Sequence, residues 1–113
     1  MITIYHNPMC SKSRECLQLL ELEQLPFTTV KYLNEPLSKK EMKELLKKLG
    51  IKPIELVRQK EAVWTSGYKD KKLTDTQIVE ALVQHPILIE RPIVVNGDKA
   101  IIARPADKVH DIL

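Results

Sequence analysis

The residue best suited to chemistry is Cys10, in the stretch YHNPMCSKSREC that spans residues 5–16. It follows a short β-branched run and precedes Ser11, Lys12 and Ser13, an unusual setting for a core cysteine. A thiol attacks as its thiolate, and an ordinary pKa of about 8.5 leaves only a few per cent ionised at neutral pH. A reactive Cys10 therefore needs neighbours that stabilise its anion.

Several features near Cys10 favour the thiolate. If a strand gives way to a helix here, the free amides of Ser11, Lys12 and Ser13 and the positive helix end point at the sulfur. His6, at the strand end, adds charge when protonated, and the Ser13 hydroxyl offers a hydrogen bond. Together these effects are expected to lower the Cys10 pKa by about one to a few units.

The same amides would also bind an oxyanion, because a helix N-terminus favours phosphate-like groups. A negatively charged nucleophile repels such a substrate, so the site needs permanent cations, and arginine holds two oxygens at once. Arg91 and Arg104 each precede a proline, which forces an extended conformation and fixes the direction of the side chain. Surface ion pairing is the alternative for both. The arginines of the chain are Arg14, Arg58, Arg91 and Arg104.

The other candidate groups have simpler interpretations. Cys16 lies six residues along the expected helix, a rise of about 9 Å, beyond the roughly 7 Å that a disulfide spans. Core packing is expected for Cys16, and its place six residues after Cys10 disfavours the Cys-x5-Arg loop of a tyrosine phosphatase. His85 is expected at a helix end and His110 on the surface, so no metal site is predicted. For Cys10 itself, inert burial remains the alternative.

The elements that position Cys10 form a β-α-β unit. Residues 2–5 read as a buried strand, residues 11–25 carry leucines at helical spacing, and residues 27–33 alternate as a second strand. Cys10 would lie at the junction between the first strand and the helix.

A helical block follows. Ser38 and Thr74 each open a capping box, which predicts helices ending at Gly50 and near His85. Between them, residues 53–67 are expected to form one further helix that begins at Pro53. Trp64 and Tyr68 are expected to pack this block.

The C-terminal part reads as β-β-α. Two β-branched runs within residues 91–105 are joined around Asn96-Gly97, the strongest short hairpin signal, and residues 106–113 supply a last helical turn. The order predicts an α/β chain with a thioredoxin-like fold. We expect a four-stranded mixed sheet, with a helical insertion at about residues 38–86 between the βαβ and ββα halves, in a single domain over residues 1–113.

Composition narrows the class of protein. At 113 residues the chain fits one domain, and 43% hydrophobic with 29% charged residues is ordinary for a globular protein. The net charge of +3 sits in mixed segments and aromatics are scarce, so no nucleic-acid groove is expected. Without a long apolar run or a leader-like start, we expect no membrane association and a cytoplasmic location.

The segments HNPMCSKSR, RQK, HPILIERPIVV and ARP together resemble the glutaredoxin-linked arsenate reductase family, specifically its shorter arsenate reductase-like branch, nearly from end to end. The resemblance implies that Cys10 attacks arsenate and expels water, that glutathione then releases arsenite, and that glutaredoxin reduces the mixed disulfide. Glutathione would be a co-substrate, with no bound cofactor or metal. The implied site comprises Cys10, His6 and Ser13 as catalytic residues; Arg58, Arg91, Arg104, Ser11 and Lys12 around the oxyanion; and Asn7 and a cis Pro92 as structural neighbours.

One departure bears on the substrate. Ser11 stands where established reductases of the family have glycine, so a Cβ borders the anion site and either weakens arsenate binding or adds a hydrogen bond. Two alternatives therefore stay open. One is a stress regulator of the same fold that binds RNA polymerase, although Ser13 replaces the second cysteine of its usual Cys-x-x-Cys switch. The other is a glutathione-dependent thiol protein without arsenate activity.

Overall fold

A computed structural model describes the whole chain, residues 1–113, and divides it into two compact units. One unit joins Met1–Glu35 with Arg91–Leu113, and the other is Pro36–Glu90. The first holds the sheet and the second holds the helical block. The expectation of a single domain stays a prediction.

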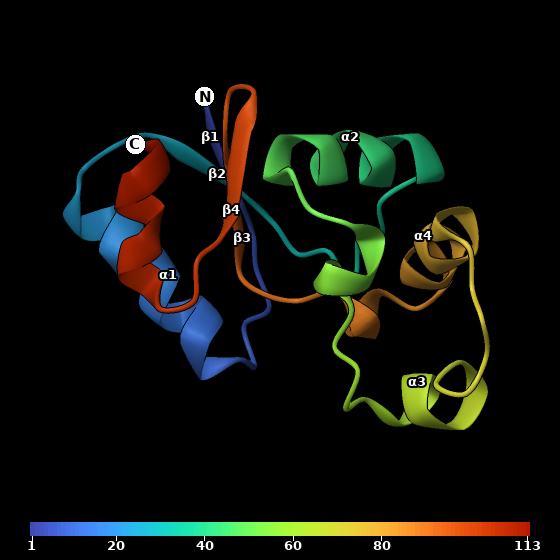
Figure 1. Cartoon of the computed structure of the whole chain (residues 1–113). Coiled ribbons are helices and arrows are strands. Elements are labelled where there is room, and N and C mark those ends of the chain that lie inside the picture. Colours follow the sequence, from blue (N-terminus) through green and yellow to red (C-terminus); the bar gives the residue numbers. More distant parts are fainter. The chain divides into compact units, whose positions relative to one another are not determined.

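The sheet has four strands in the order β2-β1-β3-β4. β1 pairs in parallel with β2, while β1 with β3 and β3 with β4 are antiparallel, and Ile4 lies opposite Val94 in the register (Figure 1). This mixed sheet confirms the predicted thioredoxin-like fold class. The strands are β1 Ile2–Tyr5, β2 Phe27–Val30, β3 Ile93–Asn96 and β4 Lys99–Ile102.

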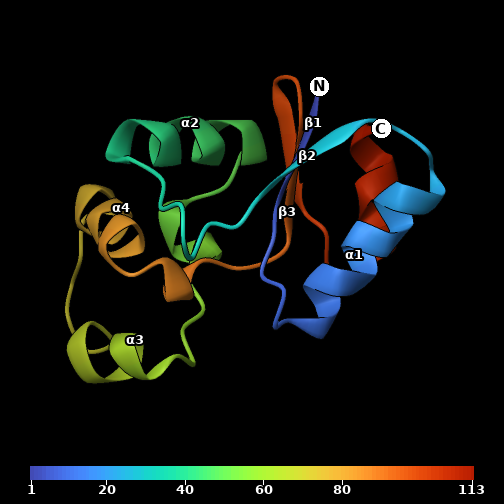
Figure 2. The same cartoon turned by 180° about the vertical axis from the view of Figure 1, so that it is seen from behind.

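Two helices cover one face of this sheet, α1 (Ser11–Leu22) and the 3-10 helix η3 (Ala106–Ile112). They lie side by side in both views (Figures 1 and 2). Burial of their apolar residues against the sheet is the main stabilising contribution, at about 25 cal/mol per Å² of apolar surface. The core cluster consists of Ile2, Ile4, Cys16, Leu20, Val94, Ala103 and Val109.

The hairpin forms as predicted, with its turn shifted by one residue. Asn96 pairs with Lys99 and belongs to β3, so the connection is Gly97-Asp98, and Gly97 takes a φ of 65°. Only glycine adopts this left-handed conformation without steric cost. The Asn96 side chain bonds outside the turn: its Nδ2 donates to the Ile112 carbonyl at 2.7 Å.

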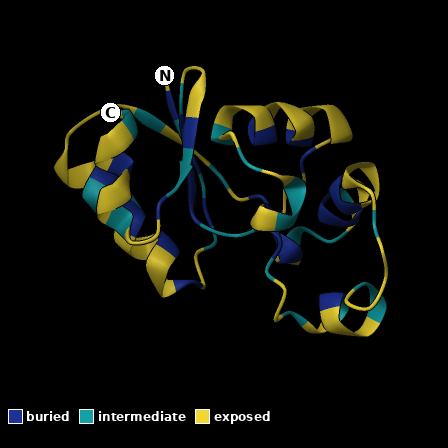
Figure 3. Cartoon of the chain, viewed as in Figure 1, coloured by how far each residue is buried: buried dark blue, intermediate teal, exposed yellow.

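The unit Pro36–Glu90 contains the helices α2 (Lys39–Leu49), α3 (Ala62–Gly67) and α4 (Asp75–Gln84). Both predicted capping boxes are present, at Ser38 and Thr74, and Gly50 ends α2 with a φ of 67°. In α2 the buried positions lie along one side and the rest of the helix is mostly exposed (Figure 3). Its lysines are all among the exposed residues. α2 packs against α4, as their apolar stripes require.

The single helix predicted over residues 53–67 is wrong. A 3-10 turn, η1 (Pro53–Leu56), is followed by extended Val57, which bridges Ile89 just after a second 3-10 turn, η2 (Pro86–Leu88). The Arg58 N–H donates to the Leu88 carbonyl at 2.7 Å and the Glu90 N–H to the Leu56 carbonyl at 2.8 Å. These long-range bonds satisfy the backbone in extended form, so the helix restarts only at α3.

Other predicted bounds shorten as well. The first helix ends at Leu22 rather than near residue 25, and Gln24 takes a φ of 57°, while β2 ends at Val30. The Arg91-Pro92 bond is cis, as the resemblance implies, and the Arg104-Pro105 bond is also cis. No helix combines the length and apolar character that crossing a membrane requires.

Candidate thiol site

Cys10 is the N-cap residue of α1, with φ −100° and ψ 122°. Its N–H donates to the Asn7 carbonyl and its carbonyl accepts from the Arg14 N–H, both at 3.0 Å. Cys10 is only 7% exposed. The sulfur therefore lies where the sequence predicts, at the junction of β1 and α1, among the amides that no intrahelical carbonyl satisfies.

The surroundings of the sulfur favour its ionised form. Burial is the strongest influence and raises the pKa, since it disfavours charge. Three donors oppose burial: the Ser13 N–H, the Arg91 guanidinium, which also contributes its charge, and the Lys12 N–H. Their combined effect outweighs burial, so the pKa of Cys10 is lowered from its ordinary value.

Two hydrogen-bond donors of Arg91 have no partner in the protein. Its Nε and Nη1 atoms are buried and make no hydrogen bond within the protein. A buried unsatisfied donor costs about 1–3 kcal/mol, more when it is charged. Arg91 precedes the buried Pro92, which leads into β3, and its guanidinium reaches the Cys10 sulfur. A multi-oxygen anion would satisfy these atoms, since the guanidinium fork matches two oxygens.

Ser13 is the anchor of the loop between β1 and α1. It is fully buried, and its hydroxyl oxygen accepts from the Asn7 N–H at 3.0 Å. A hydrogen bond of 2.6 Å joins the same oxygen to His6 Nδ1. Ser13 thereby ties the end of β1 to the first turn of α1, and Asn7 is part of that tie.

His6 does not meet the expectation that it supplies positive charge. Burial lowers its pKa, and the charges of Lys31 and Arg14 lower it further, against the opposing effect of a hydrogen bond to the Ser13 backbone. The ring is therefore mostly uncharged at neutral pH. Burial at the strand end, which the sequence pattern did not reveal, is the physical reason. His6 can act on the thiol through its bond to Ser13.

Ser11 and Lys12 form the exposed start of α1. Lys12 reaches the sulfur through its backbone N–H, while its Nζ lies 3.9 Å from Glu15 Oε2. Exposed pairs of this kind contribute about 0–1 kcal/mol. The Lys12 side chain is thus directed to a neighbour on the helix.

The two remaining oxyanion candidates differ in their surroundings. Arg104 follows β4 in the same unit as Cys10 and is exposed, with its N–H donating to the Ile102 carbonyl at 2.9 Å. Arg58 belongs to the unit Pro36–Glu90, where its Nη1 lies 3.0 Å from Glu61 Oε1. A carboxylate thus already neutralises Arg58. Participation of Arg58 and Arg104 in oxyanion binding stays a prediction.

Cys16 and the other histidines match their expected structural roles. Cys16 is fully buried and free, and burial raises its pKa to about 11. His85 caps α4 with its ring 6.1 Å from that of Tyr68, and His110 is exposed beside Glu23 at 3.0 Å. No group of three or more His, Cys, Asp or Glu side chains gathers into a possible metal site.

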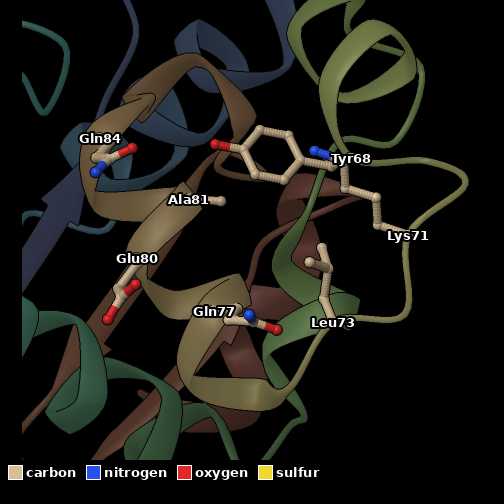
Figure 4. Close-up of a pocket in the computed structure, with 7 residues that line it drawn as sticks. All are labelled: Tyr68, Lys71, Leu73, Gln77, Glu80, Ala81 and Gln84. Carbon is tan, nitrogen blue, oxygen red and sulfur yellow. The ribbon is translucent and has the colours of Figure 1, made fainter.

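A separate pocket of about 250 Å³ lies within the helical unit (Figure 4). Tyr68, stacked on buried Trp64 at 5.3 Å, stands over it, which confirms that this aromatic pair packs the block. Part of its polar lining is engaged elsewhere, because Glu80 pairs with Lys39 at 3.3 Å. The lining contains no cysteine, histidine or arginine: it consists of Tyr68, Lys71, Leu73, Gln77, Glu80, Ala81 and Gln84.

The geometry of the loop before Cys10 is the part of the site that the sequence pattern missed. Asn7 Oδ1 accepts from the Met9 N–H at 3.0 Å, and Arg14 Nη1 donates to the Pro8 carbonyl at 2.9 Å. The Asn-Pro dipeptide was the available signal, since asparagine and proline favour turns of this kind.

Comparisons with known proteins agree with this arrangement. The family model described as "ArsC family" matches residues 5–112. The protein named "Arsenate reductase" of Haemophilus influenzae is 43% identical over 99% of this chain and 98% of its own length. "Uncharacterized protein YfgD" of Escherichia coli strain K12 is 42% identical over 99% and 96%. The solved structure "Arsenate reductase from Vibrio cholerae" superposes with a TM-score of 0.94 at 41% identity, covering 99% of this chain and 97% of that one. The chain belongs to the ArsC family.

Proposed function

We propose that this protein is an oxidoreductase that reduces arsenate through the thiolate of Cys10. Relatives that carry the name arsenate reductase match it over almost their full length, at about 40% identity. The observation that carries the proposal is a sulfur with a lowered pKa beside Arg91, whose Nε and Nη1 have no partner in the protein.

In the first step the Cys10 thiolate attacks the arsenic of arsenate. A sulfur–arsenic bond forms, and one arsenate oxygen leaves as hydroxide, which is protonated to water. Two anions must approach each other, and the permanent charge of Arg91 offsets their repulsion. The Lys12 and Ser13 N–H groups stabilise the thiolate before attack. Once the sulfur is bonded to arsenic, they can donate to the substrate oxygens instead.

In the second step glutathione supplies electrons. Its thiolate attacks the Cys10 sulfur, a disulfide forms, and the pair of the sulfur–arsenic bond stays on arsenic, which departs as arsenite. Glutaredoxin then reduces the mixed disulfide and restores Cys10. Cys16, sealed in the core with a pKa of about 11, is unsuited to resolve the adduct, so external thiols are required. We place this glutathione chemistry in the cytoplasm.

The remaining predicted residues would support this reaction. Arg104 and Arg58 would add charge for the oxyanion, and Ser11 would border it at the helix start. His6 and Ser13 would hold the sulfur in place. The regulator alternative has less support, because Ser13 is engaged with His6 and no second thiol lies at the helix start.

The decisive assay is arsenate-dependent NADPH oxidation with glutathione, glutaredoxin and glutathione reductase. Cys10→Ser is expected to abolish the rate, while Cys16→Ala, the matched cysteine control, retains it because Cys16 only packs the core. A wild-type rate no higher than that of Cys10→Ser would reject arsenate reduction. A glutathione-dependent thiol protein would then be the surviving alternative if Cys10 still forms and loses a glutathione adduct.

A further inference from the structure

The loop before the thiol presents an apolar side chain to solvent. Met9, the neighbour of Cys10, is 87% exposed. Its backbone is nevertheless fixed, because Asn7 Oδ1 accepts the Met9 N–H and Arg14 Nη1 donates to the Pro8 carbonyl. A single exposed apolar residue is ordinary, but this one lies on a braced turn beside the sulfur. A fixed backbone reduces the entropy lost when a partner binds.

The surroundings of Met9 are basic. The first turn of α1 contains no acidic residue. Arg14 and Lys31 are both exposed: Arg14 Nη1 donates to the Pro8 carbonyl at 2.9 Å, and Lys31 follows Val30, whose carbonyl accepts the His6 N–H at 2.8 Å. Neither has a carboxylate partner, whereas Lys12 pairs with Glu15. The Met9 surface, defined as Met9 with Arg14 and Lys31, therefore combines an apolar side chain with the positive charge of Arg14 beside it and of Lys31 at the end of β1.

A partner that fits this surface carries an apolar depression bordered by carboxylates. Complementary charge brings such a partner in and orients it, while the apolar contact supplies affinity. Methionine suits this role, since its unbranched thioether adapts to the shape of the partner. A small thiol needs only to reach the sulfur and gains little from Met9, whereas a protein gains the whole contact.

We propose that Met9 is the docking contact for the protein thiol that regenerates Cys10. This inference rests on the proposed function, which leaves Cys10 in a disulfide with glutathione. The partner's thiolate attacks the glutathione sulfur, the bond between that sulfur and Cys10 breaks, and its electron pair leaves on Cys10 as the thiolate. The partner retains glutathione as a mixed disulfide, so one disulfide is exchanged for another.

The test follows reduction of the Cys10–glutathione adduct, prepared on the purified protein without arsenate. Met9→Gln is expected to slow reduction by glutaredoxin about tenfold, as for a modest interface hot spot. Its rate with dithiothreitol should equal that of wild type. Met9→Leu, the matched apolar variant, should keep the wild-type rate with glutaredoxin. Lys31→Glu should slow glutaredoxin and weaken the dependence of its rate on salt.

Equal glutaredoxin rates for wild type and Met9→Gln would overturn the docking role. Slowing of the dithiothreitol reaction to the same degree would also overturn it, because the change would then act on Cys10 itself. The assay contains no arsenate, so failure of arsenate reduction and failure of docking are read separately.

Discussion

The two cysteines of α1 show how position decides reactivity. Cys10 is its N-cap and Cys16 lies in its middle, and both are buried and free. Burial pushes both pKa values upward, yet the pKa of Cys10 is lowered and that of Cys16 is raised to about 11. The difference lies in fixed donors, which Cys10 has and Cys16 lacks.

Cys16 is surrounded by aliphatic side chains of the sheet and of η3, so nothing stabilises its anion. At Cys10 the helix has just begun, and its first amides have no carbonyl to bond. Arg91 adds a charge from a separate strand end. A buried thiol is therefore inert by default, and reactive only where the fold directs donors to it.

Selective alkylation is the strongest test of this comparison. At pH 7 a pKa of about 11 leaves about one thiol in ten thousand ionised, against a few per cent for an ordinary cysteine. We expect iodoacetamide to modify Cys10 at least about a hundredfold faster than Cys16, read by peptide mass spectrometry. Unfolding in urea should abolish the difference. Similar rates for both thiols in the folded protein would contradict the comparison.

Arg91→Met tests the contribution of the guanidinium. Methionine keeps the apolar stem and removes the charge and the donors, so the Cys10 pKa should rise, as measured by alkylation rate against pH. The kcat/KM for arsenate should fall about a hundredfold, as for loss of one oxyanion donor.

Arg14→Met is the matched control for Arg91→Met. Arg14 is exposed, and its guanidinium donates to the Pro8 carbonyl rather than to the sulfur. We expect a much smaller change in the pKa of Cys10. An unchanged Cys10 pKa in Arg91→Met would show that Arg91 does not stabilise the thiolate.

The fold was predictable wherever the signal is local. Capping boxes at Ser38 and Thr74, the terminal Gly50 and the hairpin glycine each fix backbone through neighbours in sequence. The helix over residues 53–67 failed because Val57 pairs with Ile89, a partner brought in by tertiary structure. Local helical propensity is overridden by this long-range bridge, whose hydrogen bonds satisfy backbone groups that a helix would otherwise pair.

The candidate site was likewise predictable from the sequence only in part. Placement of Cys10 at a helix start follows from the strand-to-helix pattern. Arg91 was a candidate because it precedes Pro92, and the resemblance then assigned it to the oxyanion. The uncharged state of His6 did not follow, because it depends on burial and on the nearby charges of Lys31 and Arg14. Burial of a single side chain in a loop leaves no periodic trace in the sequence.

Ser13→Ala tests the side chain that anchors the loop between β1 and α1. The substitution leaves the Asn7 N–H and His6 Nδ1 without their shared partner. We expect the free energy of unfolding to fall by about 1–3 kcal/mol, measured by urea denaturation. Thr65→Ala, which removes an exposed hydroxyl from α3, should change it by less than about 0.5 kcal/mol. Equal losses in both variants would show that Ser13 is no special anchor.

His6 should make stability depend on pH in a defined direction. Its folded pKa lies below the ordinary value of about 6.5, so between the two values the unfolded chain binds a proton that the folded chain does not. The stability contribution is therefore fully present above about pH 6.5 and declines as the pH falls toward the folded pKa. His6→Gln should flatten this slope in urea unfolding between pH 5 and pH 8.

His110 provides a control of opposite sign. The hydrogen bond that His110 donates to the Glu23 carboxylate raises its pKa, so its contribution is present at low pH and is lost as the pH rises through the folded value. His110→Gln should therefore steepen the rise of stability with pH that His6→Gln flattens. If His6→Gln instead steepened it, His6 would carry a proton in the folded protein, and a charged histidine would rejoin the groups that stabilise the Cys10 thiolate.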